Sequence, residues 1–102
     1  MAKVTFVNPI WDNIDGLVND VVTNVGSTSI AVGNVSNSDE TAFEFCQAFD
    51  YSLIGYALGT TVTPTVVYNT TQLRWEDSGN RQQYLQIECD NGISESIGQV
   101  NI

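Results

Sequence analysis

The sequence predicts a mainly β fold of the β-rich α+β class: an antiparallel sheet curled into a sandwich or small barrel, with one N-terminal helix. The first observation is the composition: the chain has 20 Val and Ile residues, 10 Leu and Ala residues, and 10 Thr residues. Such β-branched side chains fit pleated sheets and lose rotamer freedom in helices. The second is the alternation of apolar and polar residues in several stretches, which is typical of half-buried strands. The 102 residues, 1–102, fit a single domain.

The N-terminal region predicts a short strand followed by the helix. Residues 3–7 alternate in polarity, and Asn8-Pro9 ends the strand because proline cannot donate to a sheet. Asn8 also suits a helix N-cap and Pro9 the first helical position, so we expect a helix over residues 9–22. Its apolar stripe has helical spacing and comprises Ile10, Ile14, Leu17, Val18, Val21, Val22 and Val25.

The middle of the chain is harder to assign. Residues 28–35 predict a strand with Ile30 and Val32 on one face. Residues 41–58 carry an apolar stripe at helical spacing but also alternate in polarity like strands. The aromatic and β-rich composition favours the strand. In either form this most apolar stretch is expected to pass through the core.

The C-terminal half predicts a hairpin, which residues 65–68 lead into. Residues 73–76 and 82–90 alternate in polarity around a cluster of turn-forming residues at 77–81. With Ser78-Gly79-Asn80 as a three-residue loop, Asp77 lies opposite Arg81, Leu73 faces Leu85, and Arg74 lies opposite Tyr84 on the solvent face. Leu73, Trp75, Leu85, Ile87 and Cys89 then share one apolar face. A last strand is expected within residues 93–102, bent at Gly98.

Two cysteines, Cys46 and Cys89, lie 43 positions apart on predicted core faces. The separation is no metal-ligand spacing. A cytoplasmic product favours two buried thiols over a disulfide. The disulfide alternative needs Cα atoms within about 7 Å of each other.

The charge is strongly one-sided, with 12 acidic residues against Lys3, Arg74 and Arg81, a net charge of −9. Phosphate backbones and anionic lipids are held by Lys and Arg clusters, so we expect no nucleic-acid and no membrane partner. No apolar run approaches the roughly 20 residues of a membrane span. The N-terminus lacks the apolar core of a signal peptide, which predicts synthesis in the cytoplasm.

The sequence contains no histidine, the commonest general base and metal ligand. Neighbouring acidic residues such as Asp12 and Asp15 are typical of a solvated surface. We therefore expect no enzyme activity, no catalytic residue, no cofactor and no metal site.

The expected function is that of a non-enzymatic structural or interaction protein. One setting that fits is the virion, with the chain as a phage capsid decoration (cement) protein. Its partners would then be other protein subunits, in a homo-oligomer or a capsid lattice. The alternatives are a carbohydrate-binding or adhesion module, and an acidic inhibitor that mimics nucleic acid. The candidate contact residues combine aromatic rings with one cation: Tyr68, Arg74, Tyr84 and Trp11.

Overall fold

The computed structural model describes residues 2–18, 20, 22, 29–36 and 38–92. Its elements are β1 (Lys3–Val7), the 3-10 turns η1 (Trp11–Asn13) and η2 (Asp15–Leu17), β2 (Ala31–Val32), α1 (Ser38–Gln47), β3 (Ser52–Asn69) and β4 (Arg74–Asp90). The mainly β fold with one helix is confirmed. The sheet order is β1-β4-β3-β2, and β2 runs parallel to β3, so the sheet is mixed rather than antiparallel. The sheet is not closed.

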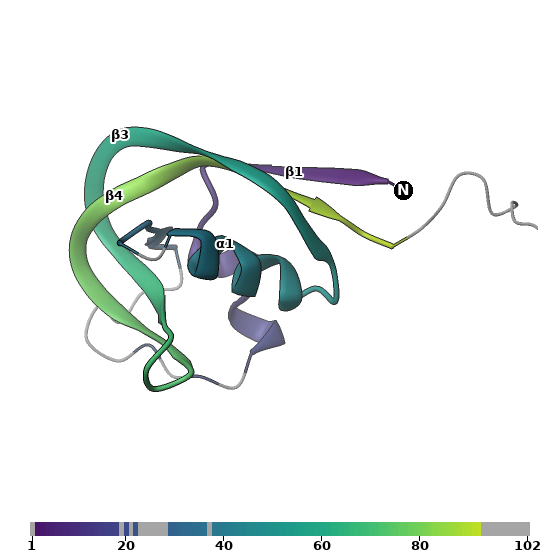
Figure 1. The fold of residues 1–102 in the computed structure, drawn as a ribbon. Helices are drawn as coiled ribbons and strands as arrows, with labels where there is room; N and C mark the ends of the chain where they lie inside the picture. The colour runs from purple at the N-terminus through teal and green to yellow at the C-terminus, as the bar shows by residue number, and fades with distance from the viewer. Residues whose placement is uncertain (1, 19, 21, 23–28, 37, 93–102) are drawn as a thin grey trace, which may run out of the picture.

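The long β3–β4 hairpin bends around α1, which lies on its concave side (Figure 1). The pairing of β3 with β4 shifts register at four places. Each extra residue on one strand increases local twist and bends the pair. The shifts therefore let two long strands curl over a single helix.

The predicted hairpin turn is wrong, because residues 78–80 lie inside β4. The actual turn covers residues 70–73, where Asn69 Oδ1 accepts hydrogen bonds from the N–H groups of Thr71 and Gln72. At the predicted turn, Gly79 pairs with Thr65 while Asp77 pairs with Val66, which leaves Ser78 as a bulge residue. Gly79 has φ +68°, a left-handed value that a bulge and a turn both use.

The predicted core face of residues 73–89 is correct only in part. Trp75, Ile87 and Cys89 are buried, whereas Leu73 and Leu85 are 72% and 50% exposed. Leu73 is a turn residue. Leu85 is the extra residue between the Gln86 and Tyr84 pairings, and the inward-facing parity of β4 changes there.

The strand predicted at residues 3–7 is confirmed as β1, and Phe6 stacks against Phe49 at 4.9 Å between ring centroids. The helix predicted over 9–22 is wrong, since its described residues form only the turns η1 and η2 and the backbone is extended at Val18. Gly16 and the valines are weak helix formers. Burial of Trp11 and Ile14 and the bond from Ile10 N–H to Asn13 Oδ1 hold the tighter turns instead.

Of the strand predicted over 28–35, residue 28 lies outside the described residues, and among residues 29–35 the strand covers only Ala31–Val32. For residues 41–58 the preferred strand is wrong at the start, where α1 forms, and correct from Ser52 onward. Asp39 and Glu40 lie in the first helical turn, where negative charge is favourable. The predicted strand at 93–102 lies outside the described residues.

The two cysteines form a disulfide, which corrects the preference for free thiols. Cys46 on α1 and Cys89 on β4 are both fully buried, and their Cα atoms are 5.6 Å apart. The shared core position was predicted, but the thiol preference depended on the expected compartment rather than on geometry. The bond fastens α1 to the concave side of the hairpin.

Candidate functional site

Two of the four predicted contact residues are in the core. Trp11 is 1% exposed and packs edge-on against Trp75 at 5.5 Å between centroids. Tyr84 is fully buried, and its hydroxyl donates a hydrogen bond to the Ser38 carbonyl oxygen. Tyr84 was expected on the solvent face because the bulge at Leu85 carries no clear sequence signal. The aromatic stacking platform of the carbohydrate hypothesis is therefore not formed by these residues.

The other two lie near the β3–β4 turn. Tyr68 is half-buried and pairs across the strands with Trp75, ring centroids 5.6 Å apart. Arg74 is exposed, and its Nε lies 3.5 Å from Glu76 Oε1. Its partner across the strands is Asn69, so the expected position opposite Tyr84 is wrong. The structure thus does not bring the four residues together.

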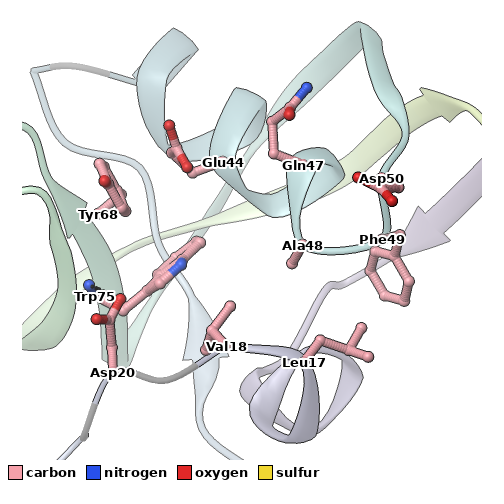
Figure 2. A pocket seen from close by; sticks show the side chains of 10 residues that line it. All are labelled: Leu17, Val18, Asp20, Glu44, Gln47, Ala48, Phe49, Asp50, Tyr68 and Trp75. Atoms are coloured by element: carbon pink, nitrogen blue, oxygen red, sulfur yellow. Dashed lines mark hydrogen bonds between the residues drawn. The ribbon is translucent and has the colours of Figure 1, made fainter.

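A groove of about 590 Å³ opens between α1, η2 and the end of the hairpin, and Figure 2 shows its lining. The end of η2 and the segment after it supply the floor of the groove. The end of α1 and the residues after it supply one wall, and β3 and β4 supply the other. Its apolar lining consists of Leu17, Val18, Ala48 and Phe49. Its remaining residues are Asp20, Glu44, Gln47, Asp50, Tyr68 and Trp75.

The groove is electrostatically negative. Asp20 is held in place because its Oδ2 accepts a 2.7 Å hydrogen bond from the Trp75 backbone N–H. Partial burial, then the charges of Glu40 and Asp20, raise the pKa of the Glu44 carboxyl. Burial, then the charges of Glu44 and Asp20, raise the pKa of the Tyr68 hydroxyl. These three groups therefore share one field that opposes further negative charge and favours a cation.

A second surface feature is an exposed apolar patch, defined here as Val7, Leu58 and Leu85. These side chains are 66%, 48% and 50% exposed. Leu58 and Leu85 line one hollow of about 260 Å³. The Asn8 N–H donates to the Leu85 carbonyl oxygen at 2.8 Å, which brings the end of β1 to the same place.

The carboxylates of the groove were not singled out from the sequence. Asp20 lies in the stretch expected to be helical, and Glu44 in one expected to be strand. Positions 20, 44 and 50 have no spacing that indicates a common site. Only the folding of α1 against the hairpin brings these residues around one groove.

Within the described part of the chain, no group of three or more Cys, Asp or Glu residues could hold a metal ion. Among the same residues, no helix has the length and apolar character needed to cross a membrane.

Comparison with models of known protein families, with curated proteins and with solved structures gives no match in any of the three. What the chain does is therefore inferred from its own residues.

Proposed function

We propose that this protein is a non-enzymatic structural protein that acts by binding other protein subunits. In this proposal it forms a homo-oligomer or part of a larger lattice, as a phage capsid decoration protein does. The observation that supports it best is the apolar patch of Val7, Leu58 and Leu85, whose side chains are about half exposed or more. Leu58 and Leu85 line one hollow, and the end of β1 is hydrogen-bonded to Leu85 through Asn8. Large apolar side chains that are exposed close together are typical of contact sites.

The position of the patch also favours a protein contact. Leu85 is exposed because a bulge interrupts β4, and bulges commonly re-aim side chains. Within the described residues β1 is an outer strand of the sheet, so its backbone groups can pair with another chain. A partner that covered the patch would bury apolar surface, and each Å² removed from water would stabilise the complex by about 25 cal/mol.

The disulfide supports the virion setting over a protein that stays in the cytoplasm. Disulfides persist in oxidising surroundings, which include virion surfaces. The chain would be made in the cytoplasm and its Cys46–Cys89 bond would form after assembly or release. No catalytic role, cofactor or metal is part of the proposal, and neither nucleic acid nor membrane is a partner.

We further propose that the bent sheet is a partly open barrel. β1 and β2 are the two outer strands of the described sheet. The isolated bridge between Ile10 and Ala31 joins the segment that follows β1 to β2. A second bridge joins Gly33 to Gln83 of β4.

The two alternatives have less support. The carbohydrate hypothesis required exposed rings, and Trp11 and Tyr84 are buried. The nucleic-acid mimic required carboxylates along one face. The described acidic residues are instead spread over the 3-10 turns, α1, β4 and the connecting segments.

The experiment is sedimentation of the full chain over a range of concentrations, in enough salt to screen the charge. We expect a mass that rises with concentration in the wild type, and a monomer in the variants Leu58→Ser and Leu85→Ser. The matched control is Leu73→Ser, which removes a leucine that is 72% exposed but lies in the β3–β4 turn. The proposal would be contradicted if the wild type stayed monomeric at every concentration. It would also be contradicted if Leu73→Ser weakened self-association as much as Leu58→Ser and Leu85→Ser.

A further inference from the structure

We propose that the acidic groove is a docking site for an arginine or lysine side chain from a basic segment of a partner protein. The groove lies apart from the apolar patch, since none of its lining residues belongs to that patch or to the hollow beside it. It would give an assembling protein a second contact, of different chemistry.

Charge complementarity is the first argument. Three carboxylates line the groove, from Asp20, Glu44 and Asp50, and none of the described lining residues is basic. The chain's own cations are engaged elsewhere. Lys3 lies 3.8 Å from Glu88, Arg74 lies 3.5 Å from Glu76, and Arg81 Nε donates to Ser78 Oγ at 3.0 Å. The negative charge of the groove therefore has no cationic neighbour among these side chains.

The shape of the groove is the second argument. Its volume of about 590 Å³ lies within the roughly 300–1,000 Å³ of typical ligand sites. Figure 2 shows Glu44, Tyr68 and Asp20 at one end of the groove. Phe49 and Leu17 lie toward the other end, with Asp50 beside Phe49. An arginine or lysine side chain suits this arrangement, because its apolar stem can pack on Phe49 and Leu17 while its charged head binds the carboxylates of Glu44 and Asp20.

The third argument concerns the type of cation. Asp20 Oδ2 already accepts a hydrogen bond from the Trp75 N–H at 2.7 Å. Within the described residues, no group of three or more Cys, Asp or Glu residues is placed to hold a metal ion. A head group with several N–H donors can reach separated carboxylates, which a small ion cannot. A second copy of this chain is a poor occupant, because each copy carries a net charge of −9 and only three basic residues.

The test is a titration of the isotope-labelled full chain with the peptide acetyl-Ala-Leu-Arg-Leu-Ala-amide, followed by amide chemical shifts at neutral pH. We expect saturable shifts that centre on Glu44, Ala48 and Tyr68. The same peptide with norleucine in place of arginine should give no saturable shifts, because it retains the apolar stem without the charge. Spermidine should give only weak shifts spread over the acidic surface.

Variants make the test specific. Glu44→Gln should weaken peptide binding by about tenfold, the loss expected for one charge-assisted hydrogen bond. Asp50→Asn should weaken binding less than Glu44→Gln, because Asp50 lies beside Phe49 at the other end of the groove. Asparagine tolerates the φ of +64° at that position. The matched control is Glu40→Gln, which removes the same charge one helical turn away, outside the groove, and should change affinity by less than about twofold.

The proposal is overturned if the arginine and norleucine peptides bind alike, if spermidine gives the same saturable pattern, or if Glu40→Gln weakens binding as much as Glu44→Gln. Leu58→Ser and Leu85→Ser should bind the peptide like the wild type. Failure of the groove and failure of the apolar patch are therefore distinguishable.

Discussion

At the scale of single residues, Tyr84 shows how a polar group on a buried ring contributes to stability. Its ring packs edge-on against Tyr56, and its hydroxyl donates to the Ser38 carbonyl oxygen at the start of α1. Burial is the main cause that raises the pKa of this hydroxyl, so it stays protonated and keeps donating. The bond joins β4 to α1 independently of the disulfide.

We expect Tyr84→Phe to lower the free energy of unfolding by about 0.5–1.5 kcal/mol, the net contribution of one hydrogen bond. Urea unfolding measures the change. The control is Tyr51→Phe, which removes the hydroxyl of a half-buried ring stacked on Phe49 and should cost less than about 0.5 kcal/mol. Equal losses in the two variants would show that the Ser38 bond contributes nothing specific.

Glu44, unlike Tyr84, lowers the stability of the folded protein at neutral pH, because its charge is unfavourable there. Burial and the nearby charges of Glu40 and Asp20 raise its pKa above the ordinary value of 4.5. As pH rises from 4.5 through that raised value, the unfolded chain loses the Glu44 proton before the folded chain does. Stability therefore falls over this window, and the cost is complete above it.

We expect Glu44→Gln to raise the free energy of unfolding at neutral pH by about 0.2–0.5 kcal/mol, since it removes a like-charge pair one helical turn apart. The figure is small because the group is partly exposed to solvent. The gain should disappear below pH 4.5, where the carboxyl is protonated in both states. A gain that persisted in acid would mean that shape, not charge, causes it.

At the scale of elements, the disulfide connects two elements that lie far apart in sequence. The bond between Cys46 and Cys89 spans 43 positions and joins α1 to β4. A closed loop of this length restricts the unfolded chain by about 4 kcal/mol in the chain-entropy model.

We therefore expect the double variant Cys46→Ala, Cys89→Ala to lose about 4 kcal/mol of unfolding free energy. Reductant should destabilise the wild type by a comparable amount and leave the double variant unchanged. Wild-type protein whose unfolding midpoint is unaffected by reductant would contradict this role.

Gly33, the residue after β2, lies very close to β3 because it has no side chain. A Cβ at this position would lie 2.8 Å from the Cβ of Thr65, which is fully buried and β-branched. We expect Gly33→Ala to cost about 1–3 kcal/mol through overpacking, measured by thermal or urea unfolding. The control, Gly55→Ala in β3, adds a Cβ with no atom within 4 Å and should be neutral or slightly stabilising. Equal behaviour of the two would refute the close packing.

For the whole molecule, the sequence predicted the mainly β character of the fold, β1 and the core positions of Cys46, Cys89 and Ile87. The antiparallel sheet and the N-terminal helix were wrong. It did not predict where the hairpin turns. The residues at 77–81 have the chemistry of a turn, and a bulge inside a strand uses the same glycine conformation. Two bulges in β4 then change which side chains face inward. Tyr84 is therefore buried and Leu85 exposed, the reverse of the prediction.

The helix and the groove were missed for a related reason. The short helix α1 has one buried face and a polar first turn, but its aromatics also favour a strand. The groove needs α1, η2 and the hairpin in their final positions, which is tertiary information. Local periodicity does not contain it.

In the proposed function, the patch of Val7, Leu58 and Leu85 is where this protein contacts another subunit. Backbone hydrogen exchange at low and high protein concentration tests it most directly. We predict that amides at the end of β1 and around Leu58 and Leu85 exchange more slowly at high concentration, while the turn at 70–73 is unchanged. Exchange that is the same at both concentrations along β1, β3 and β4 would contradict the claim.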